Sequence, residues 1–110
     1  MVEFIPRKGD FVWLNFDPQA GHEQKGRRPA LVLSNEQFNR HTGMAIVCPI
    51  TNTNRRFPFH LAVSRNCSLT GFVMVEQTKS IDYVQRQATY IESASTEYVL
   101  RVQAVLDACL

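Results

Sequence analysis

Short apolar runs, separated by glycine, proline and asparagine, make up most of the chain and limit the folds that it can adopt. Each run is rich in valine, isoleucine, phenylalanine and tyrosine, which is typical of β-strands. The spaces between the runs leave little room for the crossover helices that a parallel sheet requires. Antiparallel strands are therefore predicted at residues 10–16, 30–34, 44–50, 59–64, 71–77 and 86–91.

Only the C-terminal segment has a long helical pattern. From Thr96 onward, apolar residues recur at steps of three and four, which predicts an amphipathic helix with Ser95 as its N-cap. Ser34 and Gln37 form a capping-box pattern that predicts a short helical turn, and residues 80–84 predict another. The expected fold is mainly β with α, a small antiparallel β-barrel of five or six strands closed by the C-terminal helix.

The length of 110 residues suits one domain, and we expect residues 1–110 to form it. No apolar run approaches the roughly 20 residues of a membrane-spanning helix. The N-terminus lacks the basic-then-apolar layout of a signal peptide, so a cytoplasmic location without membrane attachment is expected.

Cysteine and histidine are too dispersed to indicate a cofactor site. Cys48, Cys67 and Cys109 are odd in number and form no C-x-x-C pair, so buried free thiols are expected rather than disulfides or a zinc site. The histidines form no metal-binding pattern, and His60 is expected to be a partly exposed strand residue. We therefore expect neither a metal nor another cofactor.

The formal charge of +2 is small, but its distribution is uneven. Lys25, Arg27 and Arg28 cluster immediately before Pro29. Proline biases the preceding residue toward an extended conformation, so Arg28 is expected to be held at a loop–strand junction. A solvated loop whose charges only maintain solubility is the alternative interpretation.

A second polar block covers residues 49–59, where a predicted strand gives way to hydroxyls, amides and two arginines. Thr51 and Asn52 offer hydrogen-bonding groups that suit phosphate oxygens and base edges. Arg55 and Arg56 can bind phosphate through two N–H groups each. A hairpin loop of turn-forming residues is again the alternative. Gln77 and Lys79 form a weaker third block.

The order and spacing of these blocks resemble the MazF/PemK family of toxin endoribonucleases. The resemblance runs from Gly9 to about Ile91, continues into the C-terminal helix, and includes "TGMAIVCPITN", "FPF" and "GFVMVEQTKSID". One departure is Glu76-Gln77, where many relatives have Asp-Gln. The resemblance implies an SH3-like or CcdB-like barrel that usually forms a homodimer. Its strongest part comprises Gly21, Glu23, Gln24, Gly26, Arg28, Pro29, Val32 and Ser34.

The resemblance also implies a function. It implies the toxin of a type II toxin–antitoxin system, a metal-independent and sequence-specific endoribonuclease that cuts single-stranded mRNA and arrests translation and growth. The products would carry 2′,3′-cyclic phosphate and 5′-hydroxyl ends. The expected partners are RNA and an antitoxin with an acidic, partly disordered segment that covers the basic groove.

The resemblance also implies site residues, at the positions that match the family's motifs. The catalytic set is Arg28, Thr51 and Glu23, with Arg28 stabilising charge on the phosphate and Thr51 donating a hydrogen bond to it. The general base stays open between Glu23, His22 and an arginine that acts mainly as acid and stabiliser. The expected RNA-binding residues are Gln24, Lys25, Arg27, Asn52, Arg55, Arg56, Gln77 and Lys79.

Two other functions fit a small barrel. One is a toxin of the same fold that poisons DNA gyrase, as CcdB-like proteins do, with the C-terminal helix as the functional element. The other is a barrel that binds nucleic acid without cutting it. Phe16 and Phe57 could stack on bases, but packing in the core is the favoured interpretation for both.

Overall fold

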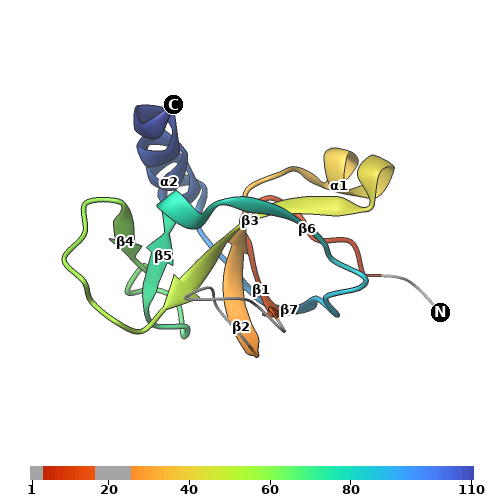
Figure 1. Cartoon of the computed structure of the whole chain (residues 1–110), viewed down its shortest axis with the longest axis horizontal. Coiled ribbons are helices and arrows are strands. Elements are labelled where there is room, and N and C mark those ends of the chain that lie inside the picture. The colour runs from red at the N-terminus through yellow and green to blue at the C-terminus, as the bar shows by residue number, and fades with distance from the viewer. Residues whose placement is uncertain (1–3, 17–25) are drawn as a thin grey trace.

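The computed structural model describes residues 4–16 and 26–110. No helix within these ranges is long and apolar enough to cross a membrane. In chain order the elements are β1 (Asp10–Asn15), β2 (Arg27–Val32), α1 (Glu36–Thr42), β3 (Met44–Thr51), β4 (His60–Ala62), β5 (Phe72–Met74), the 3-10 helix η1 (Val75–Gln77), β6 (Lys79–Asp82), β7 (Thr89–Ser93) and α2 (Thr96–Cys109) (Figure 1).

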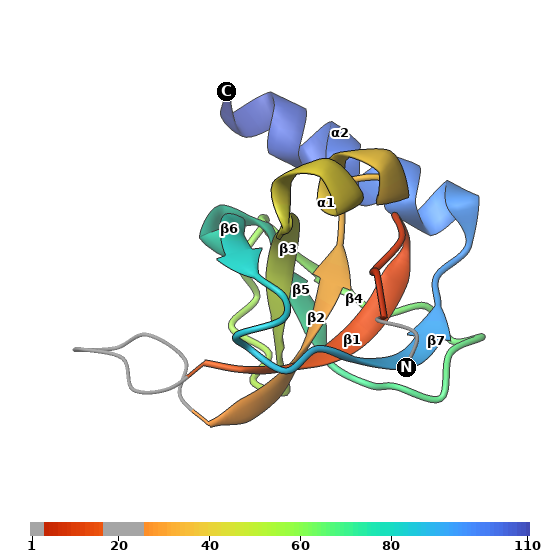
Figure 2. The same cartoon turned by 90° about the vertical axis from the view of Figure 1, so that its right-hand side faces the viewer.

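The strands form one curled antiparallel sheet. Its main path runs β4-β5-β3-β2-β1-β7, and β6 pairs with the first half of β3. The expected architecture, a small mainly β fold with a C-terminal helix, is confirmed. The sheet of the described residues has seven strands rather than five or six, and β4 and β7 lie at the two ends of its path. Both helices lie at the top of both views (Figures 1 and 2).

Each face of the sheet carries its own apolar core, because neighbouring residues of a strand point to opposite faces. Leu31 and Cys48 belong to the first core, where Val99 and Val102 of α2 pack. Val32 belongs to the second core, on the opposite face. Residues of β1, β2, β3 and β6 pack together there. The second face is the one that carries the candidate site.

The C-terminal helix begins as predicted. The Ser95 hydroxyl accepts a hydrogen bond from the backbone N–H of Tyr98 at 3.1 Å, which is the N-cap interaction. The capping prediction for α1 was wrong by one residue, because Asn35 caps this helix through Phe38 N–H. Ser34 instead donates its hydroxyl to the buried Asn39 side chain.

The prediction of a helical turn at residues 80–84 was also wrong for its first residues. Lys79–Asp82 is strand β6, paired with Met44–Val47 of β3. The turn comes afterwards, where Asp82 Oδ1 accepts from the N–H groups of Val84 and Gln85. A similar shift affects β2, which begins at Arg27 rather than Ala30 because it pairs with β1 from that residue.

The three cysteines are free, and their burial differs. Cys48 is buried, Cys67 is half-buried and Cys109 is exposed, so the expectation of buried thiols holds fully only for Cys48. Burial is the main cause that raises the pKa of the Cys48 thiol to about 11. This thiol is therefore protonated and unreactive at neutral pH.

Candidate functional site

Arg28 and Thr51 lie on the same face of two neighbouring strands, β2 and β3. The antiparallel β2–β3 pair sets Ala30 opposite Pro49 and Val32 opposite Val47. This pairing ends at Ala30 and Pro49, and Arg28 and Thr51 each lie two residues beyond it, so alternation directs their side chains to the same face as Ala30 and Pro49. Residues opposite each other in an antiparallel pair share a face, so both belong to the face of the second core.

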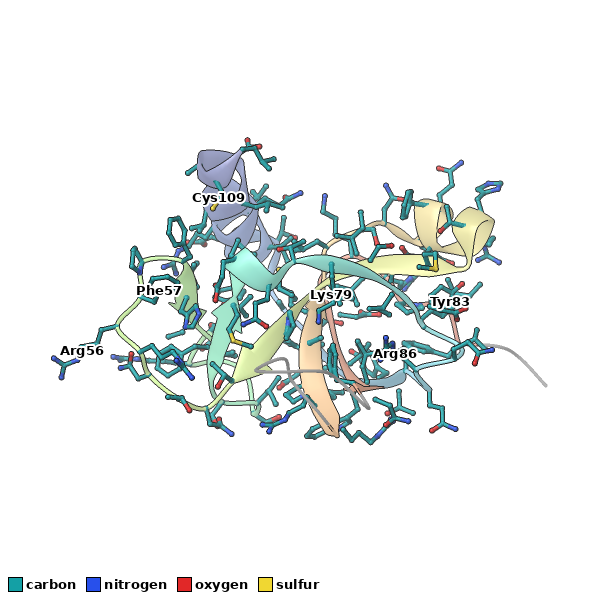
Figure 3. All side chains as sticks on the ribbon, viewed as in Figure 1. Arg56, Phe57, Lys79, Tyr83, Arg86 and Cys109 are labelled. Carbon is teal, nitrogen blue, oxygen red and sulfur yellow. The ribbon has the colours of Figure 1, made fainter. Side chains whose placement is uncertain are left out.

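Lys79 joins this face from the other edge of β3. It pairs with Val47, and its Nζ lies 5.1 Å from the centroid of the Phe16 ring. Phe16 is fully buried, which confirms the core-packing interpretation for this residue. The cation–π contact holds the ammonium group over the core, close to the central strand (Figure 3).

Thr51 is held in place from two sides. The backbone N–H of Thr53 donates to Thr51 Oγ1 at 3.2 Å. A hydroxyl has one donor and two acceptor positions, so its hydrogen stays available for another group. On the strand side, Thr51 pairs with Phe72 of β5, and Gly71 packs directly against the Thr51 backbone. Thr51 is largely buried but lines a cavity that is open to solvent.

A cavity of about 420 Å³ opens next to Thr51, over β4, β5 and η1. Its volume is within the range of small-molecule sites. The strand register places Met74 opposite His60 and Phe72 opposite Thr51, so the cavity lies on the same face as Arg28. It is lined by Thr51, Arg55, Phe57, His60, Met74, Glu76 and Gln77.

One wall of this cavity contains a histidine–carboxylate pair that sequence reasoning did not identify. His60 Nε2 lies 2.8 Å from Glu76 Oε2. The His60 side chain is only 3% exposed, and its Nδ1 has no hydrogen-bond partner among the described residues. The expectation of a partly exposed strand residue is confirmed for His60 as a whole, which begins β4 and is half-buried, although its imidazole is almost fully covered. The pairing follows from the β4–β5 register, which no local sequence signal reveals.

The loop between β3 and β4 carries Arg55 and Arg56, which were predicted to bind RNA, and an aromatic ring at the rim of the cavity. Phe57 is 44% exposed and packs edge-on against Phe59 and His60, so the core interpretation was wrong for this residue. Arg55 lines the cavity, whereas Arg56 points outward from the loop (Figure 3). Asn52 is exposed at the start of the same loop, beside Gly71.

Arg27 directly precedes Arg28 in β2, and its side chain points to the opposite face of the sheet. Its guanidinium donates to Asn15 Oδ1, Gln87 O and Thr89 Oγ1, all at 2.9 Å. These hydrogen bonds join β2 to β1 and to the region before and within β7. Thr51, Arg55 and Gln77 therefore line one cavity, Arg28 and Lys79 lie on the same face of the sheet, and the hydrogen bonds of Arg27 hold it on the opposite face.

The other predicted residues of the glycine-bounded loop, Glu23, Gln24 and Lys25 with the alternative base His22, lie outside the described residues. Within 4–16 and 26–110, no three histidine, cysteine, aspartate or glutamate side chains gather as ligands for a metal ion. The site that the structure does describe offers fixed cations, a hydroxyl and a pocket. This combination suits a phosphate group and the base attached to it.

Comparison with known proteins agrees with this geometry. Residues 7–110 match the family model described as the PemK-like, MazF-like toxin of type II toxin-antitoxin system. The endoribonuclease toxin ChpB of Escherichia coli K12 is 42% identical over 111 aligned positions, covering 91% of this chain and 93% of ChpB. The endoribonuclease toxin MazF of the same organism is 35% identical, covering 94% of this chain and 93% of its own length.

Solved structures support the same assignment. The crystal structure of MazF from Deinococcus radiodurans superposes with a TM-score of 0.91 at 37% identity, covering 97% of both chains. MazF in the MazE–MazF complex of that organism superposes with a TM-score of 0.88 at 37% identity, covering 97% of this chain and 96% of the other. The matched residues include every described residue of the candidate site. The chain therefore belongs to the PemK-like, MazF-like family of type II toxin–antitoxin toxins.

Proposed function

We propose that this chain is a sequence-specific endoribonuclease that cuts single-stranded RNA in the cytoplasm and thereby arrests translation and growth. Its membership of a toxin family, and the endoribonuclease names of its ChpB and MazF relatives, support the activity. The observation that carries the mechanism is that Arg28 of β2 and Thr51 of β3 lie on one face of the sheet, which also holds Lys79.

The nucleophile in this proposal is the 2′-hydroxyl of the RNA itself. It loses its proton, attacks the adjacent phosphorus, and expels the 5′-oxygen of the next nucleotide, which takes up a proton. The products are a 2′,3′-cyclic phosphate and a 5′-hydroxyl. Negative charge grows on the phosphoryl oxygens during the attack, and fixed donors that face this charge lower the barrier.

The described residues supply those donors. The Arg28 guanidinium is planar and permanently charged, so it can bind two phosphoryl oxygens at once. Thr51 adds its hydroxyl hydrogen, and Lys79 and Arg55 add charge on either side. The proton acceptor is either Glu23 or His22, or it is a solvent base with Arg28 as acid and stabiliser.

We extend the proposal to the partners. An antitoxin segment that is acidic and partly disordered would bind across the face formed by Arg28, Thr51, Lys79 and Arg55, where opposite charge speeds capture. MazF of D. radiodurans has been solved in complex with MazE, which supports a protein partner of this kind. We also propose a homodimer as the working unit.

Incubation of the purified protein with a defined single-stranded RNA in excess EDTA tests the activity. We expect cuts at a limited set of sites, with ends that accept 5′ phosphorylation directly and carry a 2′,3′-cyclic phosphate. RNA that is bound but never cut would instead indicate a binding barrel. DNA breaks that require gyrase, with intact RNA, would indicate the gyrase poison.

A further inference from the structure

The cavity beside Thr51 has a chemistry that the cleavage reaction alone does not require. Arg28 and Thr51 account for the phosphate, whereas the cavity extends away from them over β4, β5 and η1. Nucleotides on either side of a scissile phosphate carry bases that must occupy some surface. A cavity of about 420 Å³ next to the reacting group has room for one of them.

The wall of this cavity presents hydrogen-bond acceptors. A carboxylate oxygen only accepts, so His60 donates from Nε2 to Glu76 Oε2 over 2.8 Å. The carboxylate of Glu76 keeps Oε1 and further lone pairs for a ligand, and its side chain remains 31% exposed. Nδ1 of His60 is itself buried, without a partner among the described residues, so the acceptor that this pair offers to the cavity is the Glu76 carboxylate.

The rim of the cavity presents an aromatic surface. Phe57 lines the cavity and is 44% exposed, and its ring is fixed by edge-on contacts with Phe59 and His60. Proteins commonly bind unpaired bases by stacking them on such a ring while side chains contact the base edge. An aromatic rim over a wall of acceptors is therefore a complementary surface for a base that carries N–H donors.

We propose that this cavity is a base-selective subsite, in which His60 orients Glu76 to accept a hydrogen bond from the exocyclic amino group of a base next to the scissile phosphate. This inference rests on the proposed endoribonuclease function. Adenine, cytosine and guanine carry such an amino group. Uracil has none, and its single N3–H donor lies between two carbonyl oxygens that a carboxylate repels. The subsite therefore disfavours uracil at one position of the cleavage motif.

Glu76→Gln provides the sharpest variant, because glutamine keeps an oxygen for His60 and replaces the other oxygen with an amide that can donate to a uracil carbonyl. His60 is a positioning residue in this account, so His60→Phe should weaken selection and His60→Gln should partly restore it. Asp107→Asn is the matched control, since it makes the same carboxylate-to-amide change at an exposed position near the end of α2.

The test is cleavage of an RNA pool randomised around a mapped cut site, followed by sequencing of the new ends. For the wild type and Asp107→Asn we expect uracil at one position to slow cleavage about tenfold or more relative to the best amino-bearing base. Glu76→Gln should bring the two rates close to each other while the other positions of the motif keep their preferences. Circular dichroism and thermal melting check that each variant is folded.

Three results would overturn the inference without affecting the proposed activity. The first is a wild type that accepts uracil at every position, and the second is a Glu76→Gln variant with unchanged base preference. The third is a Glu76→Gln variant whose cleavage rate falls equally on all RNAs, which would place Glu76 in the chemical step. A wild type that cuts no RNA would remove the proposed function and this inference together.

Discussion

Gly71 packs so closely against Thr51 that a side chain does not fit between them. A Cβ on Gly71 would lie 2.8 Å from the Thr51 carbonyl oxygen and 2.9 Å from Ile50 Cγ2. Gly71 also has a φ of 128°, which side-chain-bearing residues rarely adopt. The backbone that presents the Thr51 hydroxyl therefore depends on a glycine in a different strand connection.

Gly71→Ala should consequently affect both stability and cleavage. Backbone strain and the contact with Thr51 together should lower the free energy of unfolding by about 2–4 kcal/mol. The folded fraction should cut RNA more slowly, because Thr51 must shift to relieve the contact. Urea unfolding and single-turnover cleavage measure the two effects. Thr70→Ala, an exposed neighbour in the same loop, should change neither, and a Gly71→Ala protein as stable as this control would refute the argument.

Asn39 should be important for stability rather than for catalysis. This fully buried side chain accepts from the Ser34 hydroxyl and donates to Pro6 O at 2.8 Å and to Ser34 O at 3.2 Å. Asn39→Ala removes all three of these hydrogen bonds from a buried site and leaves a cavity, so we expect a loss of about 2–4 kcal/mol in the free energy of unfolding. Asn66→Ala, at an exposed loop position, is the control and should lie within about 0.5 kcal/mol of the wild type.

We expect the protein to lose stability at alkaline pH because Cys48 is buried. Its pKa is raised from 9.0 to about 11, mainly by burial, so the unfolded chain releases this proton first. Between these pH values the folded state binds more protons than the unfolded state, and the free energy of unfolding falls as pH rises. The contribution is about 2–3 kcal/mol, and burial raises the pKa of Tyr98 as well, which acts in the same direction.

Unfolding measured from pH 8 to pH 11 checks this expectation. Cys48→Ala should flatten the decline, whereas Cys109→Ala, which removes an exposed thiol, should leave it unchanged. Alkylation followed by mass spectrometry offers an independent measurement. At pH 8, Cys109 should be labelled in the native protein and Cys48 only after unfolding, and rapid native labelling of Cys48 would contradict the account.

The sequence was most informative where local patterns decide the structure. The spacing from Thr96 onward and the hydroxyl of Ser95 predicted α2 correctly, because a helix depends on nearby residues. The strands were less exact, since pairing with a distant partner sets their ends. Lys79–Asp82 is a strand because it pairs with the first half of β3, and nothing within those few residues signals that partner.

In the candidate site, too, features within short motifs could be predicted, whereas contacts that depend on strand pairing could not. Arg28 and Thr51 were identified from short motifs and from a family resemblance, and both lie on the face that carries the cavity. The contact between His60 and Glu76 could not be predicted, because it depends on how β4 and β5 pair. Arg27 and Arg28 are adjacent and chemically identical, yet strand alternation directs them to opposite faces.

Thr51 provides a direct test of hydroxyl donation. Thr51→Val keeps the shape of the side chain but removes the hydroxyl, and it should slow cleavage by about 10²-fold. Thr51→Ser keeps the hydroxyl and should retain most of the rate. Single-turnover cleavage of one defined RNA at saturating protein separates this effect from RNA binding. Equal rates for the valine and serine variants would show that the hydroxyl takes no part in the reaction.

The central claim is that Arg28 stabilises the reacting phosphate, and the single-turnover rate of Arg28→Ala tests it most directly. Arg56→Ala is the matched control, because Arg56 is an exposed arginine of the β3–β4 loop that points outward and does not line the cavity. With folding verified by thermal melting, we predict that Arg28→Ala loses about 10³-fold or more in rate, that Arg28→Lys recovers only part of it, and that Arg56→Ala stays within about tenfold of the wild type. A folded Arg28→Ala protein that cuts RNA at the wild-type rate would contradict the account.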